Sequence, residues 1–314
     1  MYLTLTLNPS IDHYVRLPEG QLLLTGSPEA PSVNRASAES FEAGGKGINV
    51  AKILRRLSAD VEATGFTAGF TGSEIIRDIE AEGIVSRFIE VHGLTRINTK
   101  ITDGTGVETE INGTGPSITP SDISRLISVI NGSCCDTLFI SGSLPSGTPA
   151  DTYSLIVSAV RQSNPDIRLV LDCEGEALLK CLPSKPFLIK PNAHELSALT
   201  GIELTTSSPL PVIRDAAAKL IQRGAQNVLV SLGSSGACLL TGDGVFLSAS
   251  GINGDVISTI GAGDTMLASF IYMLDRDNNY RRALDCANGC AAKAAFSQGL
   301  PDAEALKAVI KEFS

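Results

Sequence analysis

The chain has 314 residues, of which 43% are hydrophobic and 19% are charged, so it carries enough apolar side chains for a large buried core. Its formal net charge is −9. This charge argues against a general role in nucleic-acid binding or at a membrane surface, because both depend on a basic electrostatic field. An anionic substrate would need a local cluster of positive groups that works against the overall charge.

The N-terminus and the cysteines predict a cytoplasmic protein. Residues 1–7 form a strand-like run without the basic stretch that precedes the apolar part of a secretory signal. No apolar run approaches the ~18 residues that a membrane span needs. The seven cysteines include no C-x-x-C pair and the three histidines are far apart, which favours reduced thiols over disulfides or a zinc site.

Apolar strand-like runs alternate with helix-like segments along most of the chain. The strand-like runs are short and almost wholly apolar, as is typical of strands buried on both faces of a parallel sheet. The pattern predicts a doubly wound α/β core, with helices on both faces of a mostly parallel sheet. The predicted strands are 3–7, 137–141, 168–172, 187–190 and 227–232, and the predicted helices are 47–57, 151–161, 263–274, 280–296 and 302–313.

Residues 95–112 break this pattern. They read TRINTKITDGTGVETEIN, two alternating strands around an Asp-Gly pair at 103–104, which predicts a two-residue hairpin turn. Because side chains alternate across a strand, Arg96, Asn98 and Lys100 share a polar face and the isoleucines lie on the other face. The pattern fits either a surface hairpin with one solvated side or a flap that closes its polar face over a ligand.

Residues 259–265 (TIGAGDT) lead into the predicted helix 263–274. Gly261 and Gly263 permit a tight turn, and the start of a helix offers free amide donors and a positive dipole end, which together suit a phosphate group. Asp264 would repel a phosphate unless it has the task of accepting the proton of an attacking hydroxyl. The alternative is that Asp264 only caps the helix.

Two other segments combine polar residues with a predicted helix start. Residues 43–49 (AGGKGIN) do not match the Walker A pattern, and Lys46 suits either an anion or a solvated loop. Residues 190–195 (KPNAHE) follow a predicted strand. There, Asn192 and Glu195 have the spacing of a helix capping box, or they orient Mg²⁺ and its waters near phosphates.

Three more motifs follow predicted strands. Residues 231–236 (SLGSSG) suit a nucleotide loop or a plain hairpin turn, residues 141–145 read SGSLP, and in residues 8–12 (NPSID) Asp12 suits sugar hydroxyls or a turn. Ligand sites in α/β sheets lie at the carboxyl ends of the strands. We therefore expect these motifs to converge on one edge of the sheet.

Taken in order, the motifs NPSID, AGGKGINVAK, TRINTK, SGSLP, KPNAHE, SLGSSG and GAGDT resemble the PfkB (ribokinase-like) carbohydrate kinase family over about residues 3–298. Within this family, TRINTK followed by ETEINGTGP resembles the 1-phosphofructokinases. Tagatose-6-phosphate kinases share NPSID, AGGKG and SGSLP and remain the alternative, together with 6-phosphofructokinases of the same family.

The resemblance implies one ribokinase-like domain over residues 1–314, with a small β-strand lid formed by approximately 10–38 and 94–113. It also implies the transfer of a phosphoryl group from ATP, with Mg²⁺, to a hydroxyl of a sugar phosphate. The apolar lid face with Ile97, Ile101, Val107 and Ile111 would be covered in a homodimer, as it is in relatives. Ser258 replaces an Asp that binds a monovalent cation in some members, so potassium dependence is not predicted.

The resemblance also implies roles for single residues. Asp264 matches the catalytic base, and the backbone of Gly261, Ala262 and Gly263 matches the anion hole. Arg96 matches the arginine that reaches from the lid to the substrate phosphate. Glu195 matches the residue tied to Mg²⁺, through water. The other implied contacts are with the substrate, from Asp12, Gly44, Gly45, Lys46, Asn49, Lys100 and Ser141, and with the nucleotide, from Lys190, Asn192, Ser231, Gly233, Gly236 and Asn288.

Two other functions fit these residues less well. A kinase for an unphosphorylated sugar or nucleoside has no evident use for two cations, Arg96 and Lys46. A non-catalytic sugar-phosphate sensor needs no catalytic base, so it would have no use for Asp264.

Overall fold

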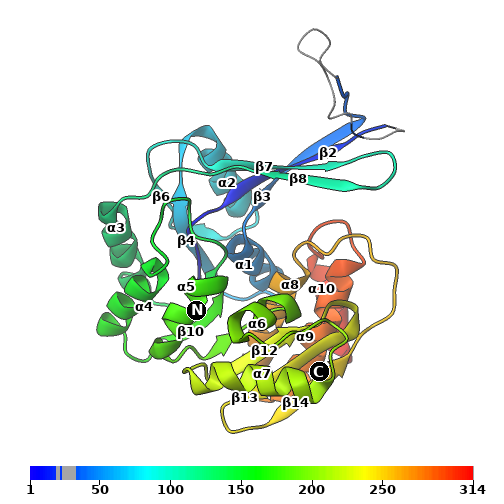
Figure 1. Ribbon diagram of the computed structural model, residues 1–314. Helices are drawn as coiled ribbons and strands as arrows, with labels where there is room; N and C mark the ends of the chain where they lie inside the picture. Colours follow the sequence, from blue (N-terminus) through cyan, green and yellow to red (C-terminus); the bar gives the residue numbers. More distant parts are fainter. Residues whose placement is uncertain (19–21, 23–32, 314) are drawn as a thin grey trace.

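The computed structural model describes residues 1–18, 22 and 33–313, and within them a sheet of ten strands forms the centre of the molecule (Figure 1). In spatial order its strands are β14 (Phe246–Ser250), β13 (Gly236–Thr241), β12 (Asn227–Ser231), β11 (Leu188–Ile189), β10 (Arg168–Asp172), β9 (Thr137–Ser141), β1 (Tyr2–Thr6), β4 (Val61–Thr67) and β5 (Val85–Ser86), with β6 (Ile89–Glu90) also paired to β4. The pairs from β12 to β6 are parallel, whereas β13 and β14 are antiparallel additions at one edge.

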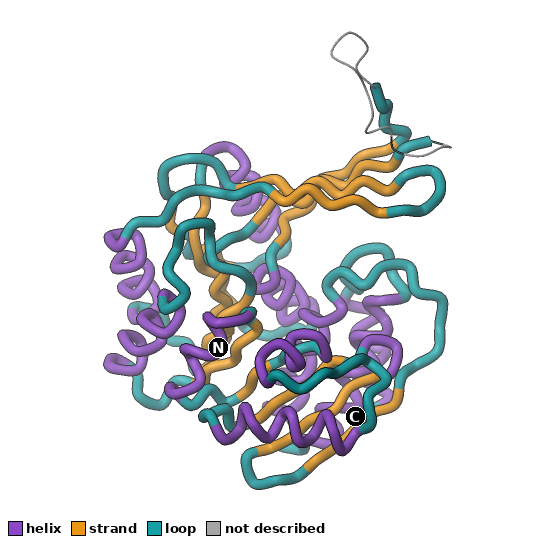
Figure 2. Tube along the Cα trace, in the orientation of Figure 1, coloured by secondary structure: helices purple, strands orange, loops and turns teal. Residues whose placement is uncertain are grey.

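Helices cover both faces of this sheet, as predicted (Figure 2). Each face has its own apolar core. Neighbouring strand residues such as Leu138 and Phe139 are both fully buried but belong to different cores, because side chains alternate across a strand. One face carries α3 (Pro120–Asn131), α4 (Thr152–Ser163), α5 (Gly175–Cys181), α6 (Ala193–Thr200) and α7 (Leu210–Gln222), and the other carries α1 (Lys46–Arg56), α2 (Gly69–Ala81), α8 (Ala262–Asp277), α9 (Tyr280–Ala295) and α10 (Ala303–Glu312).

Every predicted strand and helix of the core is present, with ends within three residues of the predicted ones. The seven cysteines all lie in the described residues, and their thiols are free. Six of them are buried, and Cys134 is exposed. Among the helices that the structure describes, none is long and apolar enough to cross a membrane.

A second sheet of four strands stands above the carboxyl ends of the central strands (Figure 1). Asp12 pairs with Asn98 across this sheet, and both residues are buried. Phe41 and Ile111 belong to the opposite, exposed face. The strand order is β3 (Ala38–Gly44), β2 (Ser10–Arg16), β7 (Arg96–Thr102) and β8 (Glu108–Asn112).

The prediction of a two-residue turn at Asp103-Gly104 is wrong. Thr102 pairs with Glu108, so five residues, 103–107, connect β7 and β8. The Asp103 carboxylate accepts hydrogen bonds from the backbone amides of Thr105 at 2.9 Å and Val107 at 3.1 Å. These side-chain hydrogen bonds stabilise a loop of five residues, which is longer than the two-residue turn that the Asp-Gly pair predicts.

The second sheet also differs in extent from the predicted lid segments. Strand β3 continues to Gly44, beyond the predicted segment 10–38. Within that segment, residues 19–21 and 23–32 lie outside the described residues.

Candidate active site

The motifs that follow strands meet, as expected, in one cleft of about 710 Å³ between the central sheet and the second sheet. A shallower groove of about 1120 Å³ lies on the outer side of Arg96, and the glycine loops do not line it. The predicted site residues that line the cleft are Asp12, Gly45, Lys46, Asn49, Arg96, Lys190, Asn192, Glu195, Ser231, Gly233, Gly261, Ala262, Gly263, Asp264 and Asn288.

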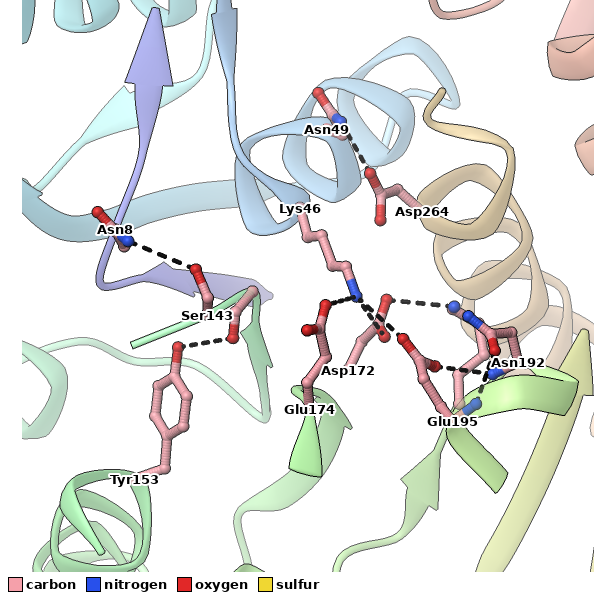
Figure 3. Close-up of polar contacts among 12 residues, drawn as sticks. Asn8, Lys46, Asn49, Ser143, Tyr153, Asp172, Glu174, Asn192, Glu195 and Asp264 are labelled. Carbon is pink, nitrogen blue, oxygen red and sulfur yellow. Dashed lines mark hydrogen bonds and ion pairs between the residues drawn. The ribbon is translucent and has the colours of Figure 1, made fainter. Parts of the chain in front are cut away.

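Helix α8 starts directly after the glycine loop, and Gly261 occupies its N-cap position with a φ of 75°, in the left-handed region that favours glycine. Asp264 lies in the first turn of α8 and not at the N-cap, so the helix-capping alternative for Asp264 is wrong. Its carboxylate is buried and accepts a 2.7 Å hydrogen bond from Asn49 Nδ2 (Figure 3). The first amides of a helix have no partner within it, so they remain available to an anion at this loop.

The surroundings of Asp264 make it a stronger base than an ordinary carboxylate. Its pKa is raised from 3.8 to about 6, chiefly by burial and then by the negative charge of Asp172. The hydrogen bond from Asn49 and the positive charges of Lys190 and Lys46 oppose this rise. A pKa close to the working pH is what a general base requires.

Lys46 lies among three carboxylates (Figure 3). Its Nζ is 3.3 Å from Glu174, 3.4 Å from Asp172 and 3.8 Å from Glu195. Burial alone would lower the pKa of Lys46, but these carboxylates outweigh burial and raise it, so the side chain stays protonated. The structure therefore places Lys46 on the Glu195 side of the cleft, in an acidic cluster.

Asn192 and Glu195 form the capping box that their spacing predicts. Asn192 Oδ1 accepts a 2.8 Å bond from the Glu195 amide, and Glu195 Oε2 accepts a 2.8 Å bond from the Asn192 amide. The capping box uses only one oxygen of Glu195, and the other, Oε1, is the one that approaches Lys46. Mg²⁺ at kinase sites is usually held by one or two carboxylates, phosphates and water, so this donor set fits the metal without an all-protein cage.

Arg96 is a cation without an acidic partner among the described residues. Its Nη2 donates to the Asn8 carbonyl oxygen at 3.0 Å, and its buried Nε has no hydrogen-bond acceptor. Burial lowers the pKa of Arg96 despite the opposing charge of Asp12, although an arginine stays protonated at any physiological pH. An unpaired, half-buried guanidinium is suited to bind an anionic group, and phosphate fits its planar fork.

Three hydrogen-bond donors from strands of the second sheet hold the Asp12 carboxylate. Its carboxylate accepts from Ser10 Oγ at 2.7 Å, Lys100 Nζ at 2.8 Å and Asn98 Nδ2 at 3.2 Å. A β-carbon on Gly44 would lie 2.7 Å from this carboxylate, so a side chain at Gly44 would displace Asp12. The acceptor is thereby fixed in the cleft, ready for polar groups of a ligand.

The model of the pfkB family of carbohydrate kinases matches residues 6–304. The chain belongs to this family. It is 37% identical to the 1-phosphofructokinase of Bacillus subtilis, over 99% of this chain and 98% of the relative, and 38% identical to the D-tagatose-1-phosphate kinase of Bacillus licheniformis, over 98% and 96%. The structure of Escherichia coli phosphofructokinase-2 with fructose-6-phosphate superimposes with a TM-score of 0.86 at 27% identity, over 99% of this chain and 98% of that one.

As a pfkB family kinase the chain uses ATP, and one end of the cleft offers a suitable apolar wall. Val256, Ala292 and Phe296 line this end, beside the loop with Ser231 and Gly233. Asn288 Nδ2 donates to the Ser250 carbonyl oxygen at 2.8 Å, so Asn288 also ties α9 to β14. The loop at 231–236 is a hairpin turn between β12 and β13, and Ser231 and Gly233 also line the cleft. The hairpin interpretation is confirmed, and the nucleotide contact stays a prediction.

Four predicted contact residues do not line the cleft. Lys100 is ion-paired with Asp12, and Gly44 packs against the Asp12 carboxylate. Ser141 is fully buried in β9, and Gly236 lies in β13, where a β-carbon would be 2.1 Å from the Ala249 carbonyl oxygen. Their positions indicate supporting roles behind the cleft.

Sequence reasoning missed several residues of the cleft. Asp172 ends a predicted strand and Glu174 follows it, so their position at a strand end was a usable signal. Asn8 and Ser143 lie within motifs that were singled out, and Asn8 Nδ2 lies 3.4 Å from Ser143 Oγ (Figure 3).

Proposed function

We propose that the chain is a 1-phosphofructokinase, which transfers the γ-phosphoryl group of ATP to the free primary hydroxyl of fructose 1-phosphate. The observation that carries this proposal is the pairing, in one cleft, of a buried carboxylate at a glycine loop with an arginine that lacks an acidic partner among the described residues. The first suits phosphoryl transfer and the second suits a substrate that is already phosphorylated. The relative from Bacillus subtilis supports the choice of fructose 1-phosphate.

In the proposed mechanism the protein positions the reactants and stabilises charge. Arg96 binds the phosphate of the sugar and Asp12 accepts hydrogen bonds from its hydroxyls. Asp264 takes the proton of the primary hydroxyl, and the amides of 261–263 stabilise the charge on the migrating group. Glu195 and Asn192 would hold Mg²⁺, which neutralises phosphate charge when it is bound.

Substrate comparison tests the proposal. ADP release with Mg·ATP is measured at equal concentrations of fructose 1-phosphate, fructose 6-phosphate and tagatose 6-phosphate. We expect kcat/KM at least about tenfold higher for fructose 1-phosphate, equivalent to ~1.4 kcal/mol of transition-state stabilisation. A preference for either 6-phosphate would refute this assignment while leaving the kinase chemistry intact.

A second candidate substrate is D-tagatose 1-phosphate. It is favoured by the 38% identity to the kinase from Bacillus licheniformis, and tagatose differs from fructose only in the configuration at one carbon. The assay is repeated with D-tagatose 1-phosphate, and the ratio of its kcat/KM to that of fructose 1-phosphate decides between the two substrates.

The pH dependence of kcat/KM follows from the raised pKa of Asp264. A base must be deprotonated to act, so we expect kcat/KM to fall as the pH drops through about 6, the pKa of this carboxyl. The measurement is a pH–rate profile from pH 5 to 8.5, with circular dichroism to confirm that the fold persists. Activity that stays constant down to pH 5 would exclude Asp264 as the base.

We further propose that the second sheet is a lid and that its outer face joins two copies of the chain. Phe41, Ile97 and Ile111 lie on this face with 57%, 40% and 59% of their surface exposed. These apolar side chains are the kind that a protein interface covers. Light scattering is expected to give twice the 32.8 kDa mass of one chain, and Phe41→Asp with Ile111→Asp should give the single mass. A wild-type protein of one chain mass would refute the dimer.

A further inference from the structure

Asp172 is a buried carboxylate at the end of β10, in the middle of the sheet, and its side chain is only 2% exposed. Oδ1 is 3.4 Å from Lys46 Nζ (Figure 3). Oδ2 is 3.2 Å from Lys190 Nζ. Among the described residues, no backbone amide donates to this carboxylate. Its charge is therefore balanced by the two lysines alone.

The two lysines flank the glycine loop. Lys190 is buried at the end of β11, and a β-carbon built on Gly263 would lie 3.1 Å from its Nζ. Lys46 opens α1, the same helix from which Asn49 donates to Asp264. The single carboxylate of Asp172 is therefore ion-paired with both lysines, which come from two different elements beside the candidate phosphate site.

We propose that Asp172 is a positioning residue of the phosphoryl-transfer site, which holds the ammonium groups of Lys46 and Lys190 beside the glycine loop and away from Asp264. The inference rests on the proposed role of Asp264 as the base.

The physical reason lies in the charges that face Asp264. These are Asp172 from β10, Lys190 from the end of β11 and Lys46 from α1. Without Asp172, Asp264 would be the buried carboxylate left for both lysines to pair with. The other carboxylates near Lys46 are more exposed, since Glu174 is 56% exposed and Glu195 is 23% exposed. A carboxylate paired with lysine binds a proton less strongly, and it is then a poorer base. The desolvation of buried ion pairs offsets much of their attraction, so fold stability alone gives little reason for this arrangement.

Asp172→Asn is the decisive variant, because asparagine has nearly the same shape without the charge. We expect kcat to fall roughly 10–100-fold, as is typical when catalytic groups are misplaced by a fraction of an ångström to 1 Å. The acid limb of the pH profile, which is the fall of kcat/KM at low pH, should move to lower pH by at least about half a unit. The reason is that the loss of the Asp172 charge and the freed lysines both lower the pKa of Asp264. The substrate phosphate also ionises near pH 6, but the variant leaves that ionisation unchanged.

Nucleotide binding separates this role from a purely structural one. With one negative charge removed beside two lysines, the Kd for ATP, measured by calorimetry without sugar, should stay within about threefold of the wild-type value or become tighter. A structural defect would instead weaken ATP binding and lower kcat without moving the acid limb. That second result would overturn the proposal.

Two further variants keep the test sharp. For the double variant Asp172→Asn with Lys190→Met, the logarithm of the fold-loss in kcat should be clearly smaller than the sum of the logarithms for the two single variants. The two residues act through one interaction, so their effects should not add. Strict additivity would contradict the proposal. Glu62→Gln is the matched control, because Glu62 is another buried carboxylate. It lies on β4, outside the cleft, and is ion-paired with Arg87. This variant should lower the melting temperature and leave the acid limb in place.

The result also distinguishes the inference from the proposed function. If the wild-type protein shows no preference for fructose 1-phosphate, the substrate assignment fails but the profile of Asp172→Asn can still be read with the preferred sugar. If the wild-type acid limb is present and the Asp172→Asn limb does not move, the inference fails and the proposed base stands.

Discussion

Replacement of Asp264 with asparagine is expected to lower kcat by roughly 10²–10⁴-fold, the usual contribution of a general base. The asparagine side chain can still accept the hydrogen bond from Asn49, so the geometry of the first turn of α8 should persist. The measurement is steady-state ADP release at pH 8 with saturating Mg·ATP and sugar phosphate. Near-full kcat in this variant would refute the role of Asp264 as base.

The same variant should be more stable than the wild type. The folded-state pKa of Asp264, about 6, lies above its ordinary value of 3.8, so the ionised carboxylate destabilises the fold at any pH above this range. A shift of about two units corresponds to ~3 kcal/mol. Asp264→Asn should therefore raise the free energy of unfolding in urea at pH 8 and lose this advantage as the pH falls through 6 toward 4. Equal stabilities at pH 8 would show that burial of Asp264 carries no such cost.

Replacement of Arg96 with methionine is expected to lower kcat/KM for the sugar phosphate by roughly 10²–10⁴-fold. Hydrogen bonds to charged groups contribute about 1.5–3 kcal/mol each, and the guanidinium offers two of them to a phosphate. The loss of kcat/KM should affect the sugar phosphate and leave the KM for ATP unchanged. The reason is that Arg96 lies with Asn8 and Asp12 and not in the Lys46 cluster. Initial rates with varied sugar phosphate, and separately with varied ATP, provide the measurement.

Two comparisons make the Arg96 result specific. Arg77→Met removes an arginine whose side chain is 76% exposed on α2, and it should leave both KM values unchanged. The rate measured with unphosphorylated D-fructose, which lacks the group that Arg96 is proposed to bind, should be almost insensitive to Arg96→Met. An equal loss with fructose and with its phosphate would mean that Arg96 supports the fold of the second sheet and does not bind phosphate.

The sequence predicted the core of this molecule well because buried parallel strands leave a simple signal. Runs such as 137–141 and 168–172 each have three consecutive apolar residues at their centre, and both are strands with the predicted bounds. The helix that carries Asp264 was also predicted, since its apolar face repeats with helical spacing. Strand β4 gave no such signal, because Glu62, Thr64 and Gly65 interrupt its apolar residues.

What the sequence did not reveal were the partners of the charged residues. Lys100 was expected to help bind the substrate phosphate, and in the structure it is ion-paired with Asp12, 88 positions away. Asp172 ends a predicted strand, but its importance depends on two lysines from different elements. Such contacts follow from the packing of the whole chain, which local patterns do not encode.

The bond between Asn49 and Asp264 joins residues that are 215 positions apart, and this distance has a consequence for synthesis of the protein. Chains fold from the N-terminus as they are made, and α1 and the strands around it emerge long before α8 does. The lysine cluster and the polar face of the second sheet can therefore form on a growing chain that still lacks the proposed base and the glycine loop. We therefore expect catalytic competence to arrive only when the last three helices have been made.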